Sequence, residues 1–126
     1  MPIMTTAIYA AFNATFSIIL AVMVSAKRAK TNVFLGTGSP ELFLAMRRHG
    51  NNAEYVALGL VVLLICELSG GRAWALQAIG LAFTLGRVLH AIGVGPNASL
   101  PRGFGALLSW IAIAGGSIYG AILVIK

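Results

Sequence analysis

The chain has 126 residues, of which 59% are hydrophobic and 10% are charged, whereas a soluble domain usually carries about 25% charged residues. This composition excludes an ordinary soluble domain. Lys and Arg outnumber Asp and Glu by nine to three, but the cations stand singly or in short clusters beside apolar runs. Because they form no basic face, we expect no nucleic-acid partner. The single cysteine, Cys66, excludes an intrachain disulfide.

Four largely uncharged stretches are each long enough for a membrane-crossing helix, which needs roughly 20 apolar residues. In chain order we predict helices over about residues 3–29, 41–68, 73–94 and 103–125. The turn-forming segments between them are Gly36 to Pro40, Gly70-Gly71 and Gly95-Pro96-Asn97. We therefore expect an all-α integral membrane protein, a four-helix bundle in which residues 1–126 form a single membrane domain.

The distribution of cations predicts the orientation of these spans. The loops after the first and third helices carry Lys27, Arg28, Lys30 and Arg102, whereas the opposite side has only Arg72 and Lys126. Because short loops rich in Lys and Arg stay in the cytoplasm, both termini are expected on the outer side, facing a periplasm or a lumen.

The second helix contains polar residues too deep to be loop residues. Arg47, Asn51 and Glu54 lie roughly 9 to 20 Å from its predicted start, at about 1.5 Å per residue. An ionised side chain at that depth costs about 2.5 to 3.5 kcal/mol on insertion scales, so such residues are normally paired and turned inward. Their spacing of four and then three predicts one shared helical face.

Further cations are expected on the same side of the membrane. Arg87 and His90 lie within two turns of the end of the third helix, Arg102 is at the start of the fourth, and Arg28 is at the end of the first. Such a positive cluster would attract an anionic ligand, assisted by the dipole of the fourth helix. The alternative is a structural ion-pair network in which Arg47 or Arg87 neutralises Glu54 and the outer arginines reach lipid phosphates. The few His, Cys and Glu residues have no metal-ligand spacing, so no metal site is expected.

The pattern Arg47-x-His49-x-Asn51-x-x-Glu54-Tyr55, followed by an apolar run and by Gly86-Arg87-Val88-Leu89-His90, resembles the family of membrane-associated proteins in eicosanoid and glutathione metabolism (MAPEG). The chain is most similar to its short bacterial members, over essentially its whole length. The resemblance implies a homotrimer in a bacterial inner membrane, with both termini periplasmic. It also implies glutathione as co-substrate, bound between subunits near the cytoplasmic face.

By the same resemblance, Arg47, Asn51, Glu54 and Tyr55 would hold glutathione, with Arg87 and His90 contributed by the neighbouring subunit. Arg102 and Arg28 match positions where family enzymes keep arginines, so they are the candidates for stabilising the thiolate. Ala57, Val94 and Gly103 depart from residues found in several relatives, which argues against prostaglandin isomerisation.

The function implied is a membrane-bound glutathione transferase or peroxidase acting on lipophilic small molecules from the membrane lipid. One alternative is a non-catalytic member that binds lipid or glutathione. Another is a small multidrug transporter, which the shared face of Glu54, Arg47 and Asn51 disfavours, because a transporter acid should be free to bind a cation or proton.

Overall fold

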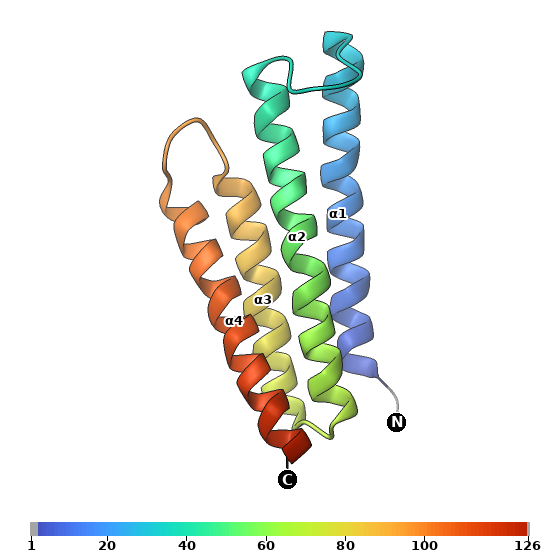
Figure 1. The fold of residues 1–126 in the computed structure, drawn as a ribbon, viewed down its shortest axis with the longest axis vertical. Helices are drawn as coiled ribbons and strands as arrows, with labels where there is room; N and C mark the ends of the chain where they lie inside the picture. The colour runs from blue at the N-terminus through green and yellow to red at the C-terminus, as the bar shows by residue number, and fades with distance from the viewer. Residues whose placement is uncertain (1–2, 126) are drawn as a thin grey trace.

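The computed structural model describes residues 3–125, which form four helices and no strand. The helices lie side by side, in the order α4, α3, α2, α1 across the view of Figure 1. Their bounds are α1 Met4–Thr31, α2 Pro40–Leu68, α3 Ala73–Gly93 and α4 Leu100–Ile125. All four are long and apolar enough to cross a membrane. The predicted all-helical membrane fold is confirmed.

The ends of the helices follow from local sequence. The Ser39 side chain caps α2 by accepting a 3.2 Å hydrogen bond from the Leu42 N–H, with Pro40 in the first turn. Gly70 adopts a positive φ of 79° after α2, and the Gly71 N–H bonds back to the Cys66 carbonyl. α4 begins at Leu100 rather than at the predicted residue 103, because the Ser99 hydroxyl accepts a hydrogen bond from the Arg102 N–H (3.4 Å) and Pro101 fits the first turn.

The two inner helices, α2 and α3, hold the bundle together. α3 packs mainly on α4, and α2 packs mainly on α1, whereas α1 and α4 make no contact within residues 3–125. α1 and α2 have 28 and 29 residues and α3 has 21, so they are about 42, 44 and 32 Å long at 1.5 Å per residue. The α1–α2 pair therefore extends well past the α3–α4 loop (Figure 1), leaving a step at this loop end.

The opposite end of the bundle is tightly closed. Leu63, Cys66 and Leu76 form its buried core, and the Cys66 thiol donates to the Gly116 carbonyl at 3.2 Å. Glu67, a residue without a role in the sequence analysis, is buried here and accepts hydrogen bonds from the backbone N–H groups of Thr5 (2.8 Å) and Thr6 (2.7 Å). A carboxylate of α2 thus caps the first turn of α1, where the helix dipole favours negative charge.

Replacement of Glu67 by Gln should destabilise the fold by about 1 to 3 kcal/mol, because two buried N–H groups lose a charged acceptor. The free energy of unfolding in detergent measures this loss. Glu41→Gln is the matched control, since Glu41 is exposed in the first turn of α2 and its loss should cost below about 1 kcal/mol. Equal losses in the two variants would contradict a capping role for Glu67.

Candidate functional site

The close approach of α3 and α4 places His90 beside the start of α4. A Cβ atom added to Gly86 would lie 2.9 Å from the Gly105 carbonyl, and one added to Gly105 would lie 2.6 Å from the Gly86 carbonyl and against the His90 N–H. A Cβ on Gly93 would collide with the backbone of Arg102. These glycines allow backbone contact between the helices, so the position of Arg102 is fixed by its main chain.

A buried arginine joins α3 to α2. Arg87 is 1% exposed, and its Nη1 donates to the Asn51 Oδ1 at 3.2 Å. Its guanidinium carbon lies 4.9 Å from the centre of the Tyr55 ring, within the range of a cation–π interaction. The partners of Arg87 are thus an amide and an aromatic ring rather than the carboxylate of Glu54.

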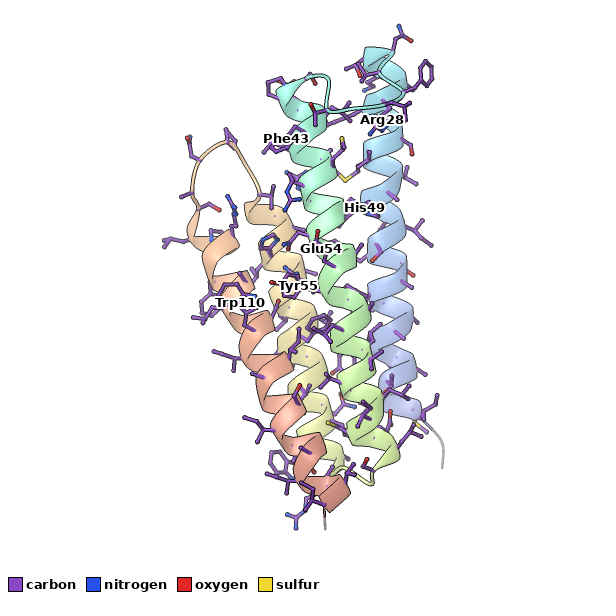
Figure 2. The ribbon with its side chains drawn as sticks, viewed as in Figure 1. Arg28, Phe43, His49, Glu54, Tyr55 and Trp110 are labelled. Carbon is purple, nitrogen blue, oxygen red and sulfur yellow. The ribbon has the colours of Figure 1, made fainter. Side chains whose placement is uncertain are left out.

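Tyr55 is in turn joined to α4. The Trp110 Nε1 donates to the Tyr55 hydroxyl oxygen at 3.0 Å, and Figure 2 labels both side chains at a similar level of the bundle. From sequence, Tyr55 is a candidate only through the family resemblance, and Trp110 has no predicted role in the site. Because its partner is 55 residues away, no local pattern could have indicated this hydrogen bond.

Two neighbouring cavities lie beside these residues. The larger one, the outer cavity, has a volume of about 420 Å³ and occupies the step at the loop end. It is lined by Pro40, Phe43, Leu44, Arg47, Asn51, His90, Val94, Gly95, Pro96 and Arg102. The inner cavity has a volume of about 270 Å³ and is lined by Asn51, Tyr55, Arg87, His90, Arg102, Gly103, Ala106 and Trp110. The two share Asn51, His90 and Arg102.

The electrostatic character of the cavities is positive. Arg47, Arg87 and Arg102 line one or both of them, and no Asp or Glu is among the lining residues. Arg102 also lies in the first turn of α4, where the helix dipole adds positive potential. The arrangement can therefore bind an anion, as the sequence predicts.

Two of the predicted site residues lie elsewhere in the protomer. Arg28 donates to the carbonyls of Val33 (3.1 Å) and Gly36 (3.2 Å) in the α1–α2 loop, and Figure 2 places it above the level of Tyr55 and Trp110. Glu54 is exposed on α2 and lines neither cavity. Arg47 and Asn51 thus line the outer cavity together, while Glu54 is exposed on the surface of the protomer.

Arg87 and His90 line the inner cavity together with Asn51 and Tyr55 of the same chain. The family resemblance assigns Arg87 and His90 to the neighbouring subunit. Within one protomer, however, they line the same cavity as two residues of the α2 motif. Sequence reasoning also missed Arg48, whose Nη2 donates to the Val94 carbonyl at 2.8 Å. That bond ties α2 to the end of α3, at the edge of the outer cavity.

Four helices long and apolar enough to cross a membrane, together with the cationic cavities beside α2, α3 and α4, define the class as an integral membrane protein with a candidate anion site. The model of the MAPEG family matches residues 6–122, so the chain belongs to this family. It is 30% identical over 111 residues to the "Inner membrane protein YecN" of Escherichia coli strain K12, covering 87% of this chain and 85% of that protein. YecN of Escherichia coli O6:H1 strain CFT073 matches with the same identity and coverage.

Substitution of Gly105 by Ala should destabilise the bundle by about 1 to 3 kcal/mol, as overpacking does elsewhere, because the new methyl group meets the backbone of α3. Gly115→Ala is the matched control on the same helix, since a Cβ there has no neighbour within 4 Å. It should leave stability unchanged or raise it by up to about 1 kcal/mol. Thermal unfolding in detergent compares the two, and an unaltered Gly105→Ala protein would refute the close α3–α4 contact.

Proposed function

We propose that the protein is a membrane-bound glutathione transferase or peroxidase that conjugates or reduces lipophilic electrophiles. Membership of the MAPEG family supports this function, and the observation that carries it is the cationic outer cavity. Glutathione has two carboxylates and one ammonium group, so it needs several cations at its site. Arg47 supplies a guanidinium group that can pair a carboxylate bidentately, Arg102 adds a second cation, and Asn51 and His90 supply further polar groups.

The size of the outer cavity is consistent with this ligand. Its volume of about 420 Å³ lies within the roughly 300 to 1,000 Å³ of small-molecule sites. Phe43, Leu44 and Val94 form apolar walls, whereas Arg47 and Arg102 stand among the polar lining residues. Such a mixed lining suits a flexible tripeptide, because charged groups orient its ends and apolar walls exclude water.

In this proposal Arg102 stabilises the glutathione thiolate. A free thiol ionises only slightly at neutral pH, and a neighbouring cation or a helix N-terminus increases the ionised fraction. Arg102 offers both, because it lies in the first turn of α4 and lines both cavities. Arg28 is the weaker candidate, since its guanidinium is already bonded to the α1–α2 loop.

The second substrate enters from lipid. An apolar groove of about 640 Å³ on the outer side of α3 and α4 is lined by residues including Leu89, Leu100, Phe104 and Leu107. Gly103 lines both this groove and the inner cavity. A lipophilic molecule in the groove would therefore lie next to the proposed thiolate.

We further propose a homotrimer in the inner membrane, with both termini periplasmic. Two related proteins are named inner membrane proteins, and the cations favour this orientation. Glu54 is exposed within a spanning helix, which is costly in lipid. A neighbouring copy covering this face would remove that cost and bring Glu54 to the glutathione site.

Arg47→Ala should weaken glutathione binding by about 10- to 100-fold, because a charge-assisted bond contributes roughly 1.5 to 3 kcal/mol. Calorimetry on the detergent-solubilised protein measures the dissociation constant. Arg72→Ala is the matched control, because Arg72 is an exposed arginine at the opposite end of the bundle. Equal affinity in the wild type and the Arg47 variant would exclude this arginine from the site.

Arg102→Leu should lower the ionised fraction of bound glutathione and reduce turnover by about 100-fold or more, as loss of an electrostatic stabiliser commonly does. Glutathione affinity should change much less. Ultraviolet absorbance of the thiolate, followed against pH, reports the ionisation directly. If the wild type binds glutathione but turns over neither an aryl halide nor a lipid hydroperoxide, the protein is a non-catalytic binder and this role is wrong.

A further inference from the structure

The inner cavity is lined by a hydrogen-bond donor that residues 3–125 leave unused. Tyr55 uses its hydroxyl oxygen to accept from Trp110, and a phenol that accepts one bond still has its own proton to donate. Tyr55 lines the inner cavity, next to Arg87, which is almost completely buried. A donor left without a partner away from water is costly, so the Tyr55 hydroxyl favours a ligand that carries an oxygen acceptor.

The Tyr55 hydroxyl is held in position from both sides. The indole of Trp110 fixes the oxygen at 3.0 Å, and the Arg87 cation lies 4.9 Å from the ring centre. Asn51 fixes that cation by accepting from its Nη1. The arrangement therefore holds the Tyr55 ring and hydroxyl oxygen in place, so that its proton can be donated to a ligand without rearrangement.

We propose that Tyr55 is a catalytic residue that donates a hydrogen bond to the carbonyl oxygen of the second substrate, and that this substrate is an α,β-unsaturated carbonyl compound with an apolar chain. The inference rests on the proposed glutathione transferase function. It assigns Tyr55 to the electrophile, whereas the family resemblance assigns it to glutathione.

The chemistry needs no oxidant or reductant. The thiolate sulfur uses a lone pair to form a bond to the β-carbon, and the carbon–carbon π electrons move to give an enolate with its charge on the carbonyl oxygen. Tyr55 stabilises that oxygen as the charge develops, in the manner of an oxyanion donor. The proton released when the thiol ionised returns through water to the α-carbon, and the product is a thioether that keeps its carbonyl group.

The geometry of the site is consistent with this order of groups. Arg102 lines both cavities, so a sulfur beside it lies at their junction. Tyr55, Arg87 and Trp110 line only the inner cavity. An electrophile in the inner cavity thus has its reacting carbon near the sulfur and its oxygen near the Tyr55 hydroxyl.

The test compares two electrophiles in the wild type and in Tyr55→Phe, reconstituted in lipid vesicles. trans-Nonenal is a long-chain enal in which charge develops on oxygen, whereas benzyl chloride reacts by loss of chloride and develops no charge on oxygen. Loss of the hydroxyl should lower kcat/KM for the enal by about 100-fold, as for other oxyanion donors. Benzyl chloride turnover and glutathione affinity should change by less than about threefold. Trp110→Phe keeps a ring but removes the N–H, and should give a smaller loss that is again confined to the enal.

Tyr119→Phe is the matched control, because Tyr119 also accepts a hydrogen bond, from the Arg72 N–H, at the far end of the bundle. It should leave both reactions unchanged. Equal losses for the enal and for benzyl chloride in Tyr55→Phe would overturn the inference, as would an undiminished enal reaction. If the wild type binds glutathione and converts benzyl chloride but not the enal, this inference alone is wrong. If it neither binds glutathione nor converts either compound, the proposed function is wrong as well.

Discussion

Arg87 carries a charge in the interior of a bundle that is built to stand in lipid. Little water reaches such an interior, so a cation there needs partners within the protein. The amide of Asn51 and the ring of Tyr55 stabilise this cation. A hydrogen bond from Trp110 connects Tyr55 to α4. Three helices are thus joined at one level, and the positions of both cavities follow from this network.

The two ends of the bundle serve different purposes. At the closed end, apolar packing around Cys66 and the carboxylate of Glu67 fix α1 against α2. At the loop end, α3 ends before α1 and α2 do. The part of α2 beyond the α3–α4 loop therefore packs beside α1 but has neither α3 nor α4 next to it (Figure 1). The closed end can therefore hold the four helices together while the loop end leaves space for a ligand.

Residues 47–55 of α2 contribute both to the cavities and to the exposed surface of the protomer. Arg47 and Asn51 line the outer cavity, and Asn51 and Tyr55 line the inner one, whereas Glu54 is exposed. Positions 54 and 55 are adjacent and lie about 100° apart around the helix, so Glu54 lies off the face that Asn51 and Tyr55 present to the inner cavity. The structural ion-pair network considered from sequence would need Glu54 beside Arg47 or Arg87. In this protomer Asn51 and Tyr55 are the partners of Arg87, and Arg47 lines the outer cavity, which Glu54 does not.

The sequence by itself determined the four spans, their approximate ends, the family and the cluster of Arg47, Asn51, Arg87, His90 and Arg102, because hydropathy, helical spacing and motif residues are local properties of the chain. Only the tertiary structure decided that Arg28 bonds to a loop, that Glu54 is exposed, that Glu67 caps α1 and that Trp110 holds Tyr55. Each of these contacts depends on the register between two helices, meaning their relative position along and around their axes. That register is set by close contacts such as Gly86 against Gly105, which join residues far apart in the chain.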